Sequence, residues 1–296
     1  MNADELRSVQ APFKERYRER AVRKVRSSWA GRKVYDWKNY LAPARPSPSE
    51  LRVIEEYLTR LTDKTDRVRV LILGSTAEFR SLCHRYGVEV ALVEFSRKHY
   101  QILSRQAMRY KGKEVVREED WRSMRTKSKY DLILGDLVLN VVARNDIPKI
   151  LRNVSESLAA GGYCLLRTWV RSNDRSYDIQ EVVTEHRQKT PRVHFYTACL
   201  IPLHFCNYDF KRDNANYPEM IANLRAACRS RLVKESEYRF CYDRWKFEGP
   251  AISIPRRSTL EKVQKRYFRA AEIRFGTDCF RHWAPIYVLR NPRTME

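Results

Sequence analysis

The chain has 296 residues, 43% of them hydrophobic, which is enough for the core of one large domain, with or without insertions. Its formal net charge of +22 favours an anionic partner, but the basic excess is spread along the whole chain, which weakens that inference. No apolar run approaches the ~20 residues that cross a bilayer, and the sequence starts without the basic-then-apolar order of a signal peptide, so we expect a cytoplasmic protein without a membrane partner.

Residues 1–66 are predicted to form a helical extension ahead of the main domain. Residues 5–30 carry apolar side chains at near-helical spacing. The densest basic run, residues 14–33, contains nine basic and two acidic residues. Such a run is typical either of a nucleic-acid arm or of the solvated face of a helix, and we favour the solvated helix.

The segment 31–49 is rich in aromatic residues and then in proline. Three prolines within six residues force an extended path. Ser47 or Ser49 can cap the next helix, which is predicted over residues 50–61. The segment is either a plain linker or a lid over a ligand, and the sequence does not favour one of these over the other.

The middle of the chain, residues 67–170, alternates short apolar segments with amphipathic ones. The first apolar segment, 68–73, is unbroken apart from Arg69, as expected for a buried parallel strand. This alternation predicts right-handed crossovers and a doubly wound α/β fold. The expected strands are 68–73, 88–95, 114–117, 130–135 and 163–169, and the expected helices are 77–85, 97–110 and 147–158, the last one stopped by Gly161 and Gly162.

Residues 171–250 interrupt the alternation and are predicted to form a helical insertion over the mouth of the pocket. An aromatic stretch, 194–206, lies between the first two helices of this insertion and is expected to be irregular. Residues 251–296 then complete the sheet. The expected elements are helices at 179–187, 217–232 and 236–245, followed by a helix at 258–267 and strands at 272–275 and 284–289.

Polar residues follow the ends of the first two strands, where an open α/β sheet forms its ligand crevice. Gly74, Ser75 and Thr76 come directly after the first strand, where a glycine lets the backbone approach a ligand and the next helix offers free N–H groups. Glu94 lies 20 residues after Gly74, a spacing typical of an acid that accepts both hydroxyls of a ribose. The alternative for Glu94 is a strand-end carboxylate paired with the basic residues that follow it.

The later strands end in further candidate site residues. Asp120 can accept a hydrogen bond from an adenine amino group, and the indole of Trp121 can cover the adenine ring. Asp136 is expected to point into the same crevice. Arg167 and Trp169 end the fifth strand and are expected to face the acceptor substrate.

This pattern resembles the class I S-adenosylmethionine-dependent methyltransferases over residues 67–170, and the last two strands fit the antiparallel end of that family's sheet. The resemblance implies a seven-stranded, mostly parallel sheet with one antiparallel strand, and S-adenosylmethionine as the cofactor. It rests on Leu71-Ile-Leu-Gly74 for the glycine motif, Val93-Glu-Phe-Ser96 for the ribose acid, Glu119-Asp-Trp121 for the adenine site, Asp131-Leu-Ile-Leu-Gly-Asp136 for the fourth motif and Leu158-Ala-Ala-Gly-Gly-Tyr163 for the helix-to-strand turn.

The resemblance also implies cofactor contacts from Phe95 and Ser96. Tyr40 and Arg45 join them, because Arg45-Pro-Ser47 and the aromatic residues before it look like a lid that some members use.

The glycine loop departs from the family pattern. Ile72 replaces an acid, and Thr76 and Glu78 stand where two later glycines are expected. Glu78 would lie at a helix N-terminus, where a negative charge is favoured. We expect it either to order the loop or to meet the cofactor's ammonium group.

The acceptor site is less clearly marked. The segment 136–140 stands where base-directed amino methyltransferases have Asp/Asn-Pro-Pro-Tyr/Phe, which argues against adenine-N6 or cytosine-N4 chemistry and leaves Asn140 as a substrate candidate. An alcohol or phenol acceptor needs a base, and His194 and His204 are the candidates, although a histidine among aromatic residues is more often simply packed. The spacing of His204, Cys206 and Cys199 fits no usual zinc pattern, so no metal is expected.

We therefore predict S-adenosylmethionine-dependent O- or N-methylation of a small molecule, with residues 171–250 forming the acceptor lid. One alternative is an RNA methyltransferase, supported by the net charge of +22 and the basic run. Another is a catalytically inactive, methyltransferase-like binding or scaffold protein, supported by the irregular glycine loop. The oligomeric state and the methylated atom do not follow from the sequence.

Overall fold

The structure is a computed structural model that describes residues 37, 40–126, 128–245 and 252–293. The predicted helix over residues 5–30 and the basic run 14–33 lie outside the described residues. Within the described part of the chain, no helix is both long enough and apolar enough to cross a membrane.

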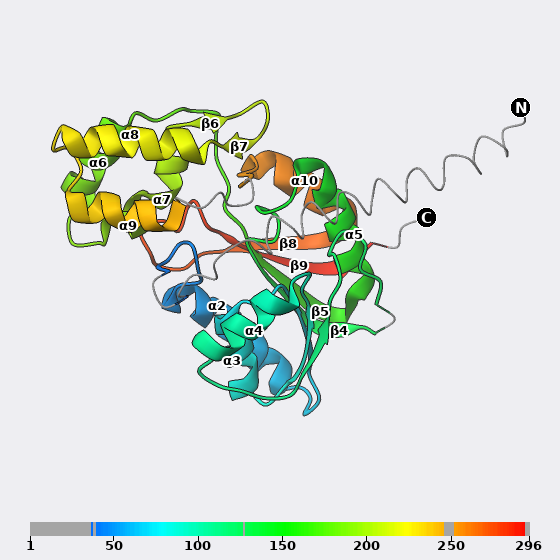
Figure 1. Cartoon of the computed structure of the whole chain (residues 1–296). Coiled ribbons are helices and arrows are strands. Elements are labelled where there is room, and N and C mark those ends of the chain that lie inside the picture. Colours follow the sequence, from blue (N-terminus) through cyan, green and yellow to red (C-terminus); the bar gives the residue numbers. More distant parts are fainter. Residues whose placement is uncertain (1–36, 38–39, 127, 246–251, 294–296) are drawn as a thin grey trace, which may run out of the picture.

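A seven-stranded sheet forms the centre of the molecule, with the strand order β3-β2-β1-β4-β5-β9-β8 (Figure 1). Neighbouring strands from β3 to β5 are parallel, whereas β9 is antiparallel to both β5 and β8. The predicted doubly wound, mostly parallel sheet is therefore confirmed. Its strands are β1 (Arg69–Leu73), β2 (Glu89–Val93), β3 (Glu114–Arg117), β4 (Tyr130–Asp136), β5 (Leu158–Arg167), β8 (Phe268–Arg274) and β9 (Ile286–Pro292).

Helices cover both faces of the sheet because alternate residues of each buried strand point to opposite faces. In β1, Val70 and Ile72 pack with the helices on one face, and Leu71 and Leu73 pack with those on the other. The first face carries α2 (Pro48–Thr62), α3 (Ala77–Arg85) and α4 (Arg97–Gln106), and the second carries α5 (Ile147–Ser157) and α10 (Arg257–Tyr267) (Figure 1).

The insertion forms a separate helical lobe beyond one end of the sheet (Figure 1). Its apolar core also includes Trp169, Ile254, Phe280 and Ala284, which lie outside the insertion. The aromatic stretch 194–206, expected to be irregular, is a helix instead. The elements of the lobe are α6 (Ile179–Lys189), α7 (Phe195–Phe205), α8 (Tyr217–Arg229), α9 (Glu235–Trp245) and a short hairpin, β6 (Tyr208–Asp209) with β7 (Asn214–Ala215).

The prediction that Gly161 and Gly162 stop α5 is wrong. The helix ends at Ser157, whose hydroxyl donates to the Asn153 carbonyl, and β5 begins at the next residue. Both glycines lie inside β5, where its register with β4 shifts. A Cβ atom on Gly162 would lie 2.9 Å from the carbonyl oxygen of Asp131, so the glycine permits a close approach of two strands.

The prediction that a serine caps α2 is confirmed for Ser47. Its hydroxyl accepts from the backbone N–H of Glu50, and the Glu50 carboxylate accepts from the backbone N–H of Ser47 at 2.8 Å. This reciprocal capping box fixes the start of the helix. Arg167, at the end of β5, donates to Glu50 and to the Pro43 carbonyl, so the segment before α2 lies at the carboxyl edge of the sheet.

Candidate active site

The turn after β1 forms the floor of the site. Gly74 has φ +93°, a conformation that favours glycine, and a Cβ atom there would lie 3.5 Å from the Trp121 ring. The Gly74 N–H donates to the Val93 carbonyl at 2.8 Å, which draws the turn against the end of β2. Ser75 and Thr76 follow, and α3 then begins without a side-chain cap from Thr76.

Glu94 lies beside this turn with its side chain fixed by two donors. The Ser75 hydroxyl donates to one carboxylate oxygen at 2.6 Å, and the Ser96 N–H donates to the other at 3.0 Å. His99 Nδ1 lies 3.5 Å from the first oxygen. Glu94 is 3% exposed, yet each carboxylate oxygen has a second lone pair for a ligand hydroxyl.

One cavity of about 270 Å³ runs from this turn to the helical lobe. Its walls combine the ends of β1, β2 and β4 with the starts of α3 and α4 and with side chains of α7, α8 and α9. The described lining residues are Trp37, Tyr40, Ala44, Leu73, Gly74, Ser75, Thr76, Glu94, Phe95, Ser96, Lys98, His99, Leu103, Trp121, Asp136, Leu137, Val141, Trp169, Tyr196, Leu200, His204, Tyr217, Arg244, Trp245 and Ile252.

Only one of the two residues predicted for the adenine site lines the cavity. Trp121 lines the cavity, its indole N–H donates to the Val93 carbonyl at 2.6 Å, and its ring meets Phe95 edge-on. Asp120 does not line the cavity among the described residues, because Arg122 holds its carboxylate. The structure thus brings Trp121, but not Asp120, to the cavity.

Asp136 and Arg167 belong to one buried ion network. Arg167 is 1% exposed, and it donates to Asp136 at 2.8 Å, to Glu50 at 2.7 Å and to the Pro43 carbonyl at 2.6 Å. Asp136 lines the cavity, whereas the described lining does not include Arg167. Arg167, expected to face the acceptor, therefore anchors the start of α2 to the end of the sheet.

Glu78 lies in the first turn of α3, as expected, but it faces the segment before α2. Its Oε1 accepts from the Trp37 indole at 3.0 Å and lies 3.7 Å from the guanidinium of Arg45. Burial raises the pKa of Glu78, although the hydrogen bond from Trp37 opposes that effect. Tyr40 stacks on Trp37 with ring centroids 5.6 Å apart, and both rings line the cavity.

The two candidate bases lie in different places. His194 precedes α7 and accepts from the Tyr196 N–H at 3.2 Å, so it caps the helix and does not belong to the described lining. His204 lines the cavity and is 1% exposed. Its Nε2 lies 3.3 Å from the Tyr217 hydroxyl.

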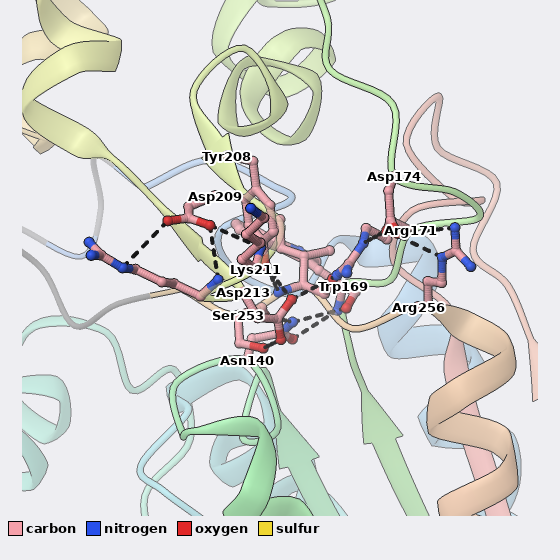
Figure 2. Close-up of polar contacts among 12 residues, drawn as sticks. Asn140, Trp169, Arg171, Asp174, Tyr208, Asp209, Lys211, Asp213, Ser253 and Arg256 are labelled. Carbon is pink, nitrogen blue, oxygen red and sulfur yellow. Dashed lines mark hydrogen bonds and ion pairs between the residues drawn. The ribbon is translucent and has the colours of Figure 1, made fainter.

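Asn140, predicted as a substrate contact, is fully buried and holds the wall of the cavity in place. Its amide donates to the carbonyls of Trp169 and Ser253, and its Oδ1 accepts from the Trp169 N–H at 2.9 Å. Figure 2 shows Asn140 between these two segments. Trp169 lines the cavity, and its indole N–H has no acceptor among the described residues.

Several lining residues were not predicted from the sequence. Apart from Leu200 they are aromatic or basic, and apart from Trp37, which precedes α2, they come from the helical lobe or from α4. The aromatic richness of 194–206 was the available signal for part of this group, but it did not show which side chains face inward. They include Trp37, Lys98, His99, Tyr196, Leu200, Tyr217, Arg244 and Trp245.

No family model and no curated protein sequence matches this chain. Solved structures do match. The N-methyltransferase NodS from Bradyrhizobium japonicum, in complex with S-adenosyl-L-homocysteine, is 14% identical, with 83% of this chain and 89% of that chain covered at a TM-score of 0.41. The CcbJ methyltransferase from Streptomyces caelestis is 19% identical, with 48% of this chain and 57% of that chain covered at a TM-score of 0.40.

A third match, from Rhodobacter sphaeroides, is described as a Zn-dependent alcohol dehydrogenase; it is 14% identical, with 84% of this chain and 92% of that chain covered at a TM-score of 0.47. The order and directions of the seven strands in this chain, with β9 antiparallel between β5 and β8, give it the class I S-adenosylmethionine-dependent methyltransferase fold.

Proposed function

We propose that this protein transfers a methyl group from S-adenosylmethionine to a small molecule held in the helical lobe. The observation that supports this most directly is the continuity of the cavity. It joins Gly74 and Glu94, at the carboxyl edge of the sheet, to Tyr196 and Trp245 of the lobe. A cofactor and an acceptor can therefore lie in one space.

The residues at the sheet edge fit this cofactor. Gly74 and Trp121 line the same cavity, and Glu94 offers carboxylate lone pairs to the ribose hydroxyls. Phe95 and Trp121 present rings to the adenine base. When bound, S-adenosylmethionine would supply an electrophilic methyl group on a sulfonium ion.

The protein's own part in such a transfer is to hold the acceptor in line and to exclude water. The lobe suits this task because most of the side chains that line its end of the cavity are aromatic or aliphatic, with Arg244 beside them. A cavity of about 270 Å³ with such a lining favours a small acceptor over a nucleic acid, which needs an open, basic groove.

The test is calorimetric titration with S-adenosylmethionine and S-adenosylhomocysteine. We expect binding by the wild-type chain and a ~10- to 100-fold weaker affinity for Glu94→Gln, because hydrogen bonds to a charged group contribute about 1.5–3 kcal/mol. Glu89→Gln is the matched control. Glu89 begins β2, the strand that Glu94 follows, but its carboxylate is exposed and pairs with Arg67 at the surface, so the affinity of this variant should equal that of the wild type.

Equal affinities of Glu94→Gln and the wild type would contradict the proposed cofactor site. If neither ligand binds the wild-type protein, the chain is better explained as a basic binding or scaffold protein. RNA binding with a steep salt dependence would instead favour an RNA acceptor, since phosphate contacts release counterions.

A further inference from the structure

Asp136 presents a carboxylate oxygen without a donor to the cavity. Its side chain is 5% exposed and lines the cavity at the end of β4. One oxygen, Oδ1, accepts from Arg167 at 2.8 Å. The other, Oδ2, has no donor among the described residues and is not fully enclosed by protein atoms. A nearly buried carboxylate oxygen in this position can bind a ligand group that carries a positive charge.

The charges of the cluster around Asp136 do not balance among the described residues. Arg167, from β5, binds the carboxylates of both Asp136 and Glu50, at 2.8 and 2.7 Å. Glu78, from α3, is a third carboxylate and pairs with Arg45 at 3.7 Å. Three carboxylates therefore share two guanidinium groups. A buried charge without a counter-charge is costly, so a cationic ligand beside Asp136 would stabilise the cluster.

The place of Asp136 along the sheet edge indicates which part of the cofactor it meets. Gly74, Glu94 and Trp121, which would hold the adenosine half, follow the ends of β1, β2 and β3. β4 is the neighbour of β1 on the other side, so Asp136 lies beyond the adenosine residues. In S-adenosylmethionine the charged sulfonium joins the adenosine half to the rest of the molecule, so it is the cation expected beside β4.

We propose that Asp136 recognises the sulfonium charge of S-adenosylmethionine and thereby distinguishes the methyl donor from its neutral thioether product, S-adenosylhomocysteine. This inference deepens the proposed function and rests on it, since it assigns a specificity-determining residue in the same cavity. Methyl transfer removes the positive charge from the sulfur, so the product lacks the attraction to Asp136 that the donor has.

Calorimetric titration of the full chain with three ligands tests this without any turnover. S-adenosylmethionine is charged at the sulfur, S-adenosylhomocysteine is not, and sinefungin carries an ammonium group where the donor has its methylated sulfonium. The variant is Asp136→Asn, which keeps an oxygen that can accept from Arg167. At pH 8 we expect it to bind S-adenosylmethionine and sinefungin ~10- to 100-fold more weakly, and S-adenosylhomocysteine less than ~3-fold more weakly.

Asp131→Asn is the matched control on the same strand. Asp131 lies near the start of β4, accepts from the Arg69 N–H at 2.8 Å and lies outside the described lining. This variant should leave all three affinities unchanged. Both variants keep the other charged or titratable side chains of the described lining, which belong to the β2–α4 segment or to the lobe: Glu94, Lys98, His99, His204 and Arg244.

The wild-type chain offers a second test that needs no variant. Burial raises the pKa of Asp136 to about 7, so its negative charge appears between pH 6 and pH 8. The affinity for S-adenosylmethionine divided by that for S-adenosylhomocysteine should rise ~3- to 10-fold over this range. The same ratio should stay constant in Asp136→Asn, which keeps Arg167, Glu50 and Glu78 around the site.

Three results would overturn the inference. Equal losses for all three ligands in Asp136→Asn would mean that Asp136 binds the ammonium group they share. Unchanged affinities in that variant would mean that its charge does not act on the cofactor. A pH dependence of the ratio that persists in Asp136→Asn would assign the effect to another group.

The same titrations separate this inference from the proposed function. If both ligands bind the wild-type chain but their ratio is the same in Asp136→Asn, only the role of Asp136 is overturned. If neither ligand binds the wild-type chain, the proposed methyl transfer is overturned and this inference with it.

Discussion

At the scale of single residues, Asp136 lies where the cavity meets the buried ion network. Burial raises its pKa to about 7, although Arg167 opposes this effect. Arg167 is shared with Glu50, and the carboxylates of Glu50 and Glu78 raise the pKa further. The folded chain therefore holds a proton on Asp136 at pH values where an unfolded chain, with a pKa of about 3.9, has already lost it.

This difference predicts a pH-dependent stability. Between pH ~4 and ~7 the folded state binds more protons at Asp136 than the unfolded state does, so its contribution to the unfolding free energy falls as pH rises, by up to about 1.4 kcal/mol per unit. Asp136→Asn has no carboxylate to titrate here, so its unfolding free energy should rise relative to that of the wild type as the pH increases from ~4 to ~7. Urea unfolding at several pH values measures this difference in unfolding free energy.

Asp146 provides a control of opposite sign. Burial acts to raise its pKa, but hydrogen bonds from Lys149 and Arg122 lower it overall. Ionised Asp146 therefore stabilises the folded state at pH values above the pKa that it has in the unfolded chain, and this stabilisation is lost as the pH falls through the lower, folded-state pKa. Asp146→Asn should therefore lose stability at pH 7 and approach the wild type in acid; parallel curves for the two variants would contradict the assignment at Asp136.

The sequence located the residues of the sheet edge better than it located their partners. The rule that ligands bind at the carboxyl ends of parallel strands placed Gly74 and Glu94 at the cavity. It could not show that Asp120 is held by Arg122 or that Asn140 holds Trp169. A strand end fixes where a side chain starts, whereas the neighbour that binds it comes from a distant part of the chain.

At the scale of elements, α2 depends on Arg167 for its place. The helix presents Glu50, 1% exposed, to a guanidinium that also binds Asp136. Arg167→Met would leave Glu50 buried without its cation, because Asp136 can take up a proton but Glu50 loses its ion-pair partner. We expect the unfolding free energy to fall by about 3–5 kcal/mol, which is typical of removing one partner from a buried ion pair.

The control for this variant contacts the same helix. Arg274, at the end of β8, pairs with Glu56 of α2, but these side chains are 28% and 45% exposed. An exposed pair contributes only about 0–1 kcal/mol, so Arg274→Met should change the urea midpoint little. If both variants lose the same stability, the Arg167 network is not what holds α2.

Helices with one apolar face were predicted better than helices buried on several sides. The prediction of α3 over 77–85 is confirmed. The spacing of apolar residues did not predict α7, where eight of eleven residues are buried and Pro202 lies inside the helix. A helix that is apolar around its circumference has no polar face to mark its period, so only its packing against α6, α8 and α9 reveals it.

At the scale of the whole molecule, a buried polar network connects the helical lobe to the sheet (Figure 2). Asp213, in the turn between β6 and β7, accepts from Arg171 and from the Tyr208 hydroxyl at 2.8 Å each, and also from the Ser253 hydroxyl. Ser253 in turn donates its N–H to the Asn140 carbonyl after β4. The network thus runs from the lobe to the segment beside Trp169 in the cavity wall.

The last prediction concerns this connection. Asp213 has φ +54°, and asparagine tolerates that conformation, so Asp213→Asn removes the charge without straining the turn. Arg171 then keeps only Asp174, which is 42% exposed, as a carboxylate partner among the described residues. We expect amide hydrogens of β6, β7 and α7 to exchange ~10- to 100-fold faster, because a buried cation has lost its buried carboxylate partner, while those of β1 and β4 keep their rates.

The control is Asp209→Asn, on the same hairpin, which replaces a carboxylate that is 42% exposed and should leave both groups of exchange rates unchanged. An equal acceleration in lobe and sheet after Asp213→Asn would mean that the two open as one cooperative unit, and that the network stabilises the whole fold and not the docking of the lobe.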